Sequence, residues 1–105
     1  PYAGASIPLD SGPVAIGRDP ALAQLVLPPA QTAISQRHAL VGYDAGRGRF
    51  FLEDCWSTNG VYLLTDRTAP KALTPGQRHP LPPGARFYLA TPEVAFAVEL
   101  RDDVS

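Results

Sequence analysis

The sequence predicts an all-β domain, specifically an antiparallel β-sandwich. Roughly ten short apolar runs follow one another along the chain, and turn residues bound each of them. Twelve prolines and nine glycines lie mostly between these runs, where they are typical of turns. No stretch keeps a helical period, whereas residues 94–100 alternate between apolar and small or polar side chains with a period of two. In a sandwich of this kind, loops gather at the two ends of the molecule.

The first part of the chain contains four predicted strands, at residues 2–9, 14–16, 25–27 and 39–43. Pro8 restricts the first of these to the edge of a sheet, because proline donates no backbone hydrogen bond. Asp19 followed by Pro20 favours one helical turn through residue 23, with Asp19 as its N-cap. Residues 30–34 are expected to form a loop.

A β-hairpin is the clearest local prediction. Residues 39–43 and 49–54 form its strands, and residues 44–48 connect them with glycines at two candidate positive-φ positions. In the second strand Phe50 and Leu52 face one side of the sheet, and Phe51 and Glu53 face the other. The remaining predicted strands are residues 61–64, 72–73, 86–89 and 94–100, with residues 65–71 and 74–84 expected as loops.

The chain length predicts one domain. A chain of 105 residues can bury a single core, here expected between about residues 7 and 100 of a domain over residues 1–105. The chain starts at Pro1 and contains no methionine, so we expect a module cut from a larger protein. It shows no apolar run long enough to span a bilayer and no signal-peptide pattern. Cys55 is the single cysteine, which excludes an intrachain disulfide and favours a reducing, cytoplasmic location.

Charge and composition narrow the range of ligands. A formal net charge of -1 argues against a broad surface for duplex nucleic acid or an anionic membrane. One cysteine and two histidines cannot supply a structural zinc site, so we expect no structural metal. All cations except Lys71 are arginines, which suits bidentate recognition of an oxyanion. Any anion is therefore expected to bind at a local site.

Three polar segments lie at the ends of apolar runs, at residues 17–18, 35–38 and 57–60. They offer the Arg18 guanidinium, the hydroxyls of Ser35 and Thr58, the Asn59 amide and loop backbone N–H groups. This set is rich in donors and contains no carboxylate, so it is poorly suited to acid–base catalysis. It matches an anion with several acceptor oxygens, such as a phosphate monoester.

Taken together, the motifs Gly17-Arg18, Ser35-x-x-His38 and Ser57-Thr58-Asn59-Gly60, with the strand 51–54 just before the last, resemble the forkhead-associated (FHA) domain family. The resemblance runs from about Ile7 to Leu100. It implies a β-sandwich of about eleven strands that binds phosphothreonine peptides through loops at one end, with no catalysis and no cofactor. The implied partner is a phosphothreonine-containing protein in signalling, either a substrate of a Ser/Thr kinase or linked to one.

The resemblance also implies a role for each motif residue. By position, Arg18, Ser35 and Thr58 resemble the residues that contact the phosphate, and Asn59 resembles the asparagine that holds the peptide main chain. Three further residues are expected to be structural, namely Gly17, His38 and Gly60. Ser57 is an alternative to Thr58 as the residue that presents a hydroxyl.

Two departures from the family pattern affect these expectations. Gln36 follows the serine where the family often has Arg or Lys, so it can donate a hydrogen bond to phosphate but brings no charge. The second Asn-Gly often found after the next strand is replaced here by residues 64–67. Arg47 and Leu64 are the candidate specificity residues, because both lie in or next to loops between strands.

Two other functions compete with phosphopeptide binding. An FHA-like scaffold could bind an unphosphorylated protein surface, which the neutral Gln36 and the apolar residues around Leu64 would suit. An enzyme could use Cys55 with His38 or His79, since a thiolate needs a nearby base. A free cysteine after an apolar strand is usually buried packing, so the sequence favours a binding module and not an enzyme.

Overall fold

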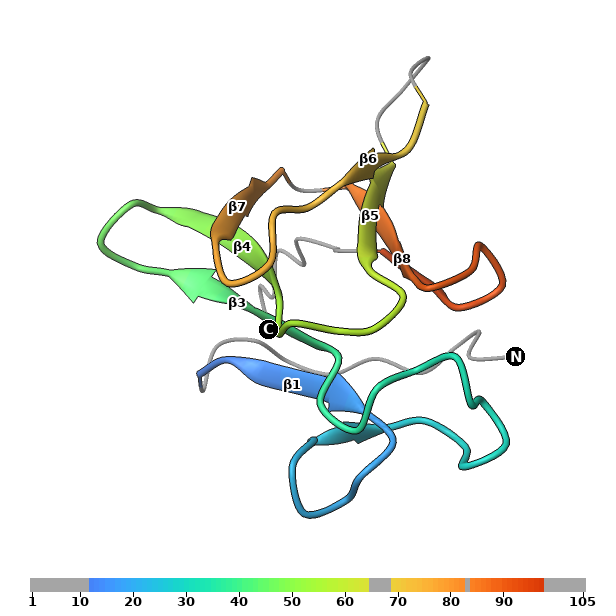
Figure 1. Ribbon diagram of the computed structural model, residues 1–105. Coiled ribbons are helices and arrows are strands. Elements are labelled where there is room, and N and C mark those ends of the chain that lie inside the picture. The colour runs from blue at the N-terminus through green and yellow to red at the C-terminus, as the bar shows by residue number, and fades with distance from the viewer. Residues whose placement is uncertain (1–11, 65–68, 83, 98–105) are drawn as a thin grey trace, which may run out of the picture.

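The computed structural model describes residues 12–64, 69–82 and 84–97 (Figure 1). These residues form nine strands and no helix: β1 Val14–Gly17, β2 Leu25–Val26, β3 Ala39–Asp44, β4 Arg49–Asp54, β5 Val61–Leu64, β6 Lys71–Ala72, β7 Arg78–Leu81, β8 Arg86–Leu89 and β9 Ala95–Ala97. The all-β prediction is confirmed, with nine strands in the described residues where about eleven were expected. The predicted strand 2–9 and the end of the strand 94–100 lie outside the described residues.

The strands form the two sheets of a sandwich. One sheet has the order β2-β1-β3-β4-β7 and the other has the order β6-β5-β8-β9. A single hydrophobic core lies between them and takes side chains from both sheets, among which Ile16, Leu52, Phe87 and Leu89 are at most 2% exposed. Figure 1 shows the layer of β3, β4 and β7 beside the layer of β5 and β8.

The predicted β3–β4 hairpin is confirmed. The two strands pair antiparallel over their whole length, from Ala39 with Asp54 at one end to Asp44 with Arg49 at the other. Of the two glycines in the connection, only Gly48 has a positive φ, of 65°. Phe50 and Leu52 face the core as predicted. Phe51 is also buried, although it lies on the outer face of the sheet, where its ring packs over Gly42 of β3.

The segment after β1 differs in part from its prediction. Asp19 accepts backbone hydrogen bonds from Leu22 and Ala23 at 2.9 Å, and its side chain accepts one from Ala21, which confirms one capped turn. The short β2 strand runs parallel to β1, so the sheet is not purely antiparallel. The strand predicted at residues 25–27 is present as β2 over Leu25–Val26. Val26 is 45% exposed on its outer face, whereas Leu27 is buried in the core.

The second half of the chain contains one unpredicted strand. β7 lies in the segment 74–84 that was expected to be a loop, and it pairs antiparallel with β4. Its sequence Arg78-His79-Pro80-Leu81 gave no strand signal, because only Leu81 is buried and a proline interrupts it. Proline is tolerated there because β7 is at the edge of its sheet and Pro80 needs no partner on the open side.

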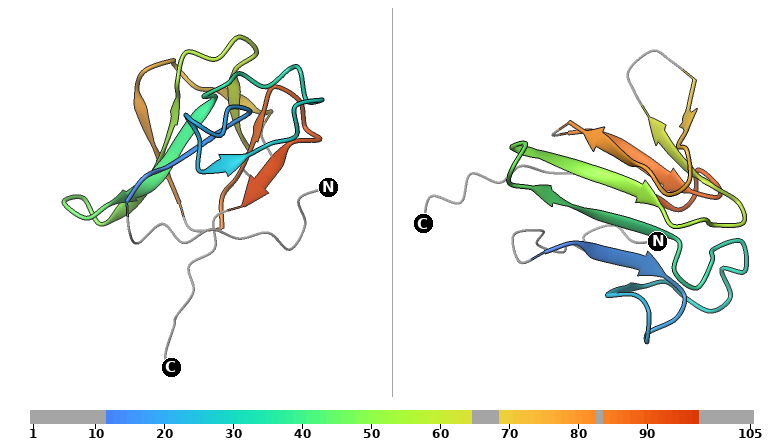
Figure 2. Two further views of the ribbon diagram at one scale, coloured as in Figure 1. Left: turned by 90° about the horizontal axis from the view of Figure 1, so that it is seen from below. Right: turned by 60° about the vertical axis from the view of Figure 1, so that its left-hand side comes forward.

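The hairpin separates two ends of the molecule. In the right-hand view of Figure 2, the β3–β4 connection lies at one end, and the loops that follow β1 and β4 and precede β3 lie at the other. β3 and β4 each have six residues, which corresponds to roughly 20 Å of length.

Candidate functional site

The three polar segments meet at one end of the sandwich because three adjacent strands begin or end there. β1 and β3 pair with Ile16 opposite Ala39, and β3 and β4 pair with Ala39 opposite Asp54. The chain therefore leaves β1 through Gly17 and Arg18, enters β3 from His38, and leaves β4 toward residues 57–60 at the same edge. Sequence alone could not establish this convergence, because it does not show strand order.

Gly17 allows the first two segments to approach each other. A Cβ atom on this residue would overlap the backbone carbonyl of Gln36 and approach the Cα of Arg37 to 3.0 Å. Asp19 N–H donates to the Gln36 carbonyl at 3.2 Å, and Arg18 N–H donates to the Ser35 carbonyl at 3.3 Å. The end of β1 and the segment 35–37 are thus joined backbone to backbone.

His38 joins the second and third segments from inside the protein. It is fully buried, and its Nδ1 accepts the Ser35 N–H at 3.0 Å. The other ring nitrogen, Nε2, therefore carries the hydrogen and donates to the Gly60 carbonyl at 2.7 Å. Burial lowers the pKa of His38, while the bond to Gly60 and the Asp54 carboxylate oppose that shift. The neutral ring thus acts as a brace between two loops.

A second set of hydrogen bonds joins the same two loops nearer the surface. Thr58 N–H donates to the Ser35 hydroxyl oxygen at 3.1 Å, which leaves the hydroxyl hydrogen of Ser35 free to donate to a ligand. Asn59 donates from its side-chain nitrogen to the Ala33 carbonyl at 2.8 Å. Its amide oxygen and second N–H have no partner among the described residues. The side chains of Thr58 and Asn59 are exposed.

The turn 57–60 is supported by a residue that sequence reasoning missed. Asp54 is 1% exposed, and its carboxylate accepts the Ser57 N–H at 2.8 Å. Ser57 in turn accepts the Gly60 N–H at 3.0 Å, and Gly60 has a φ of 88° that disfavours other residues. The signal for Asp54 was present in the sequence, because it continues the inward-facing positions of Phe50 and Leu52. Ser57 is partly buried within the turn, whereas the Thr58 side chain is exposed.

Two further side chains complete the donor set. Arg18 is partly buried and donates from Nε to the Ile34 carbonyl, and its terminal nitrogens have no partner in the described part of the chain. Gln36 is exposed beside it, on the segment that Asp19 holds through the backbone. Arg18, Ser35, Gln36, Thr58 and Asn59 therefore lie at one end of the sandwich, on loops fixed to one another.

The two candidate specificity residues do not lie at this end. Arg47 is in the β3–β4 connection, at the opposite end of the hairpin from Ser35. Leu64 is the last residue of β5, whose first residue follows Gly60. Both residues therefore lie at the far ends of elements that lead away from the polar segments.

The surroundings of Cys55 disfavour the thiolate form that a nucleophile needs. Burial raises the pKa of the Cys55 thiol, which disfavours the thiolate, and a smaller effect of Arg37 opposes that shift. Its bond to His38 is between backbone atoms, from Cys55 N–H to the His38 carbonyl at 3.0 Å. In the described residues no group of His, Cys, Asp and Glu is arranged to hold a metal ion. Those residues also contain no helix that could cross a membrane.

Comparisons with known proteins agree with this geometry. The FHA domain family model matches residues 14–90. The chain matches no curated protein sequence. Among solved structures, the FHA domain of FhaA in complex with the intracellular domain of Rv3910 is 31% identical, with a TM-score of 0.61 over 84% of this chain and 82% of that one.

Two other FHA domains superpose more closely over a greater share of the chain. One, from a study of phosphothreonine-dependent FHA domain interactions, is 27% identical, with a TM-score of 0.68 over 94% of this chain and 88% of that one. The other is the MEK1 FHA domain in complex with a HOP1 phosphothreonine peptide, at 24% identity and a TM-score of 0.73 over 94% and 91% of the two chains. The family model covers every described strand except β9 and includes all three site segments, and the chain therefore belongs to the FHA domain family.

Proposed function

We propose that this domain recognises phosphothreonine peptides and thereby mediates phosphorylation-dependent protein–protein interaction. The observation that carries the proposal is the pair of cross-loop bonds at Ser35, whose hydroxyl accepts from Thr58 and whose N–H donates to His38. These bonds hold the serine between two loops with its hydroxyl hydrogen available. Donors held in place before binding lose little freedom when an anion arrives.

The donor set divides into two parts under this proposal. Arg18, Ser35, Gln36 and Thr58 bind the phosphate, with Arg18 supplying the charge and the others neutral hydrogen bonds. Asn59 binds the peptide main chain through the amide groups that its bond to Ala33 leaves unused. The neutral Gln36 makes the expected attraction weaker than that of a site with two cations.

The related structures support the same function. FHA domains solved with phosphothreonine peptides share this fold, and one relative at 27% identity belongs to a study of phosphothreonine-dependent interactions. The proposed partner is a phosphothreonine-containing protein that is a Ser/Thr kinase substrate or is linked to a kinase. We propose that the domain is a non-catalytic signalling module of the cytoplasm and one domain of a larger protein. We expect neither nucleic acid nor membrane as its ligand.

The test is an anisotropy titration with a degenerate phosphothreonine peptide pool and its unphosphorylated counterpart. Loss of the Arg18 charge in Arg18→Ala should weaken phosphopeptide binding by about 2–5 kcal/mol. Arg86→Ala is the matched control, because Arg86 is an exposed arginine on β8 of the other sheet. Equal binding of both pools, insensitive to Arg18→Ala, would reject the proposal in favour of a scaffold for unphosphorylated protein.

A further inference from the structure

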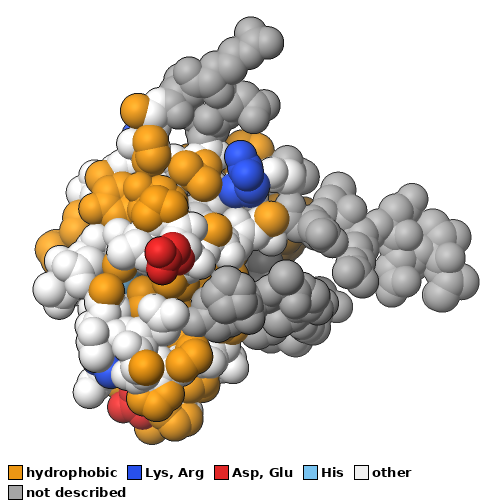
Figure 3. Space-filling view, turned by 90° about the vertical axis from the view of Figure 1, so that its right-hand side faces the viewer, with side chains coloured by type: hydrophobic (Ala, Val, Ile, Leu, Met, Phe, Trp, Pro, Cys, Tyr) orange, Lys and Arg blue, Asp and Glu red, His pale blue; other side chains and the backbone are white. Residues whose placement is uncertain are grey.

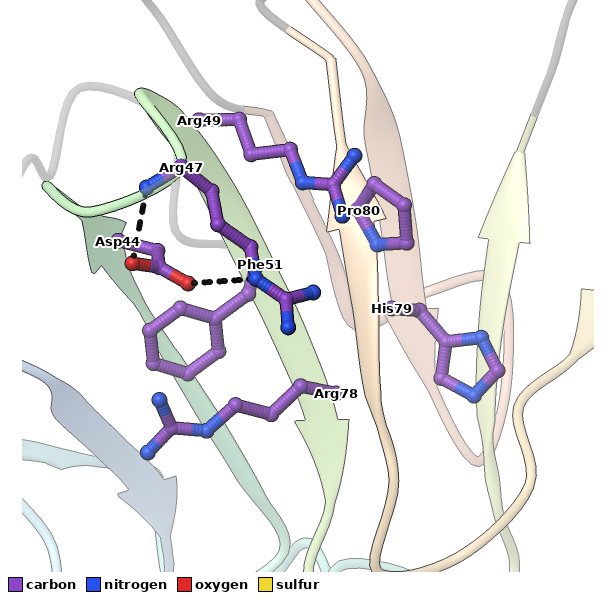
Figure 4. Close-up of a pocket in the computed structure, with 7 residues that line it drawn as sticks. All are labelled: Asp44, Arg47, Arg49, Phe51, Arg78, His79 and Pro80. Atoms are coloured by element: carbon purple, nitrogen blue, oxygen red, sulfur yellow. Dashed lines mark hydrogen bonds and ion pairs between the residues drawn. The ribbon is translucent and has the colours of Figure 1, made fainter.

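A second concave site lies on the outer face of the sheet, away from the loops described above. It is a cavity of about 340 Å³ at the β3–β4–β7 surface (Figure 4). Its lining includes the side chains of Asp44, Arg47, Arg49, Phe51, Arg78 and Pro80. These residues come from the two strands of the hairpin, its connection and β7. The cavity therefore extends along the sheet from Asp44 and Arg49, at the end remote from Ser35, to Arg78, which pairs opposite Glu53.

The cavity contains more donors than its own acids use. Arg49 makes no side-chain hydrogen bond or ion pair with any residue the structure describes. Arg47 forms an ion pair with Asp44 through Nε at 3.7 Å, and Arg78 forms one with Glu53 through Nε at 3.5 Å, both longer than a hydrogen bond of ordinary length. The terminal nitrogens of these arginines therefore remain available, and each pair can accept a bidentate carboxylate.

The floor of the cavity is rigid and aromatic. Phe51 is 4% exposed, and a Cβ on the underlying Gly42 would come within 2.8 Å of its ring, so the ring lies directly on the backbone of β3. The Arg78 guanidinium lies 4.1 Å from the ring centroid, in cation–π geometry. In Figure 4 the guanidinium groups of Arg47 and Arg78 lie on either side of this ring. The buried ring thus holds the Arg78 guanidinium in place at the cavity.

The positive charge is a local feature. Three of the lining residues are arginines and one is an aspartate, in a chain whose net charge is -1. The face shown in Figure 3, by contrast, carries mostly hydrophobic and uncharged side chains. The three arginines and single aspartate of the lining thus make the cavity locally basic, which favours a small acidic ligand.

We propose that this cavity docks an acidic segment of a partner protein, with aspartate or glutamate carboxylates paired to Arg47, Arg49 and Arg78. The inference goes beyond phosphothreonine recognition and uses none of its residues. A short protein segment fits better than nucleic acid because a cavity of about 340 Å³ with three arginines can hold a few carboxylate side chains but not an extended phosphate backbone. The two sites share no residue, and Arg47 and Arg49 lie at the opposite end of β4 from the polar loops.

The experiment is an NMR titration of the ¹⁵N-labelled domain with an unphosphorylated, glutamate-rich peptide. Amide shifts should change at residues 44–51 and 78–80 and stay constant at residues 35–38 and 57–60.

Arg49→Gln should weaken binding about threefold to fivefold, in the range of an exposed charge pair. Arg86→Gln is the matched control, because Arg86 is also an exposed first residue of a strand, and it should leave binding unchanged. Asp44→Asn should tighten binding about twofold or more, because it removes the competing carboxylate.

Several outcomes would overturn the proposal. No saturable shift, equal losses in Arg49→Gln and Arg86→Gln, or shifts centred on residues 57–60 would each remove the assigned site. Tighter binding of a thymidine oligonucleotide than of the peptide would replace protein with nucleic acid as the ligand class. A failure here leaves the phosphothreonine titration and its Arg18 dependence untouched, so the two proposals fail separately.

Discussion

The two ends of the β3–β4 hairpin are built in different ways. At the end near Ser35, the supporting residues are buried, with His38 at 0% and Asp54 at 1% exposure, and they act through hydrogen bonds of 2.7–3.0 Å. At the other end Arg47, whose side chain is 70% exposed, forms a long ion pair with Asp44 at 3.7 Å. The same two strands thus carry one end fixed by buried polar groups and one end held by surface charge.

This difference indicates what each end can recognise. Buried hydrogen bonds hold loops in one geometry, which suits an anion that must meet several donors at once. Exposed arginines keep their rotational freedom and attract a ligand by charge, which suits a segment without one fixed shape. The two ends should therefore respond differently to mutation, with large effects at the braced end and small ones at the charged end.

The largest effect is expected for His38→Ala. This change leaves the Ser35 N–H and the Gly60 carbonyl without their partner and opens a cavity beneath both loops. Since each buried unsatisfied group costs about 1–3 kcal/mol, we expect a loss of roughly 3 kcal/mol or more in the free energy of unfolding. Urea denaturation followed by the fluorescence of Trp56, the only tryptophan, measures it.

The control for that variant is His79→Ala. His79 is partly exposed, and its ring accepts one bond, from Thr74 N–H at 3.3 Å. Its removal should cost less than 1 kcal/mol. Similar losses in the two variants would mean that burial of His38 is not what braces the loops.

His38 also illustrates how far the sequence could be interpreted. Its spacing after Ser35 matched a family pattern, and that pattern implied a structural histidine. Only the folded structure shows why this histidine is structural. Its Nδ1 accepts the Ser35 N–H, and its Nε2 donates to the Gly60 carbonyl. The hairpin itself was predictable because its side chains alternate and glycines mark its turn.

Other features could not be predicted, for physical reasons. β7 has one buried apolar residue and a proline, so its strand conformation depends on pairing with β4 and not on its own pattern. Sequence alone could not place Arg47, because a loop residue between two strands can lie at either end of a sandwich. Only the register of β3 with β4 places it at the far end.

The second-largest effect is expected for Gly17→Ala. The added methyl overlaps the Gln36 carbonyl, which is backbone and cannot rotate away, so the segment 35–37 must shift. We expect a loss of about 1–3 kcal/mol in unfolding free energy and weaker phosphopeptide binding, because Ser35 moves with that segment. Gly46→Ala is the matched change at the other end, where the new Cβ comes no closer than 3.4 Å to the Asp44 side chain. Equal stability of the two variants would remove the close approach at Gly17 as a requirement of the site.

The third expectation concerns pH. Burial lowers the pKa of His38 in the folded protein below its ordinary value of 6.5, so the unfolded chain binds the proton more readily. The stability associated with the neutral ring should therefore be complete above about pH 6.5 and decline as the pH falls below it. Denaturation midpoints at pH 7.5 and at pH 5.5 measure this decline, with His38→Gln as the variant that cannot titrate. An identical decline in that variant would assign the pH dependence to other groups.

The smallest effect is expected for Arg47→Gln. Its ion pair with Asp44 is long, at 3.7 Å, and exposed, so its loss should change the unfolding free energy by less than about 0.5 kcal/mol. Binding of a phosphothreonine peptide too short to span β4 should not change at all, because Arg47 lies beyond the opposite end of that strand. Binding of the glutamate-rich peptide should fall, because Arg47 lines the second cavity.

A loss of phosphopeptide affinity of more than about twofold would show that the two ends are coupled through the hairpin, since an electrostatic effect over roughly 20 Å is largely screened at physiological salt. The contrast between a braced end and a charged end would then describe one continuous binding surface.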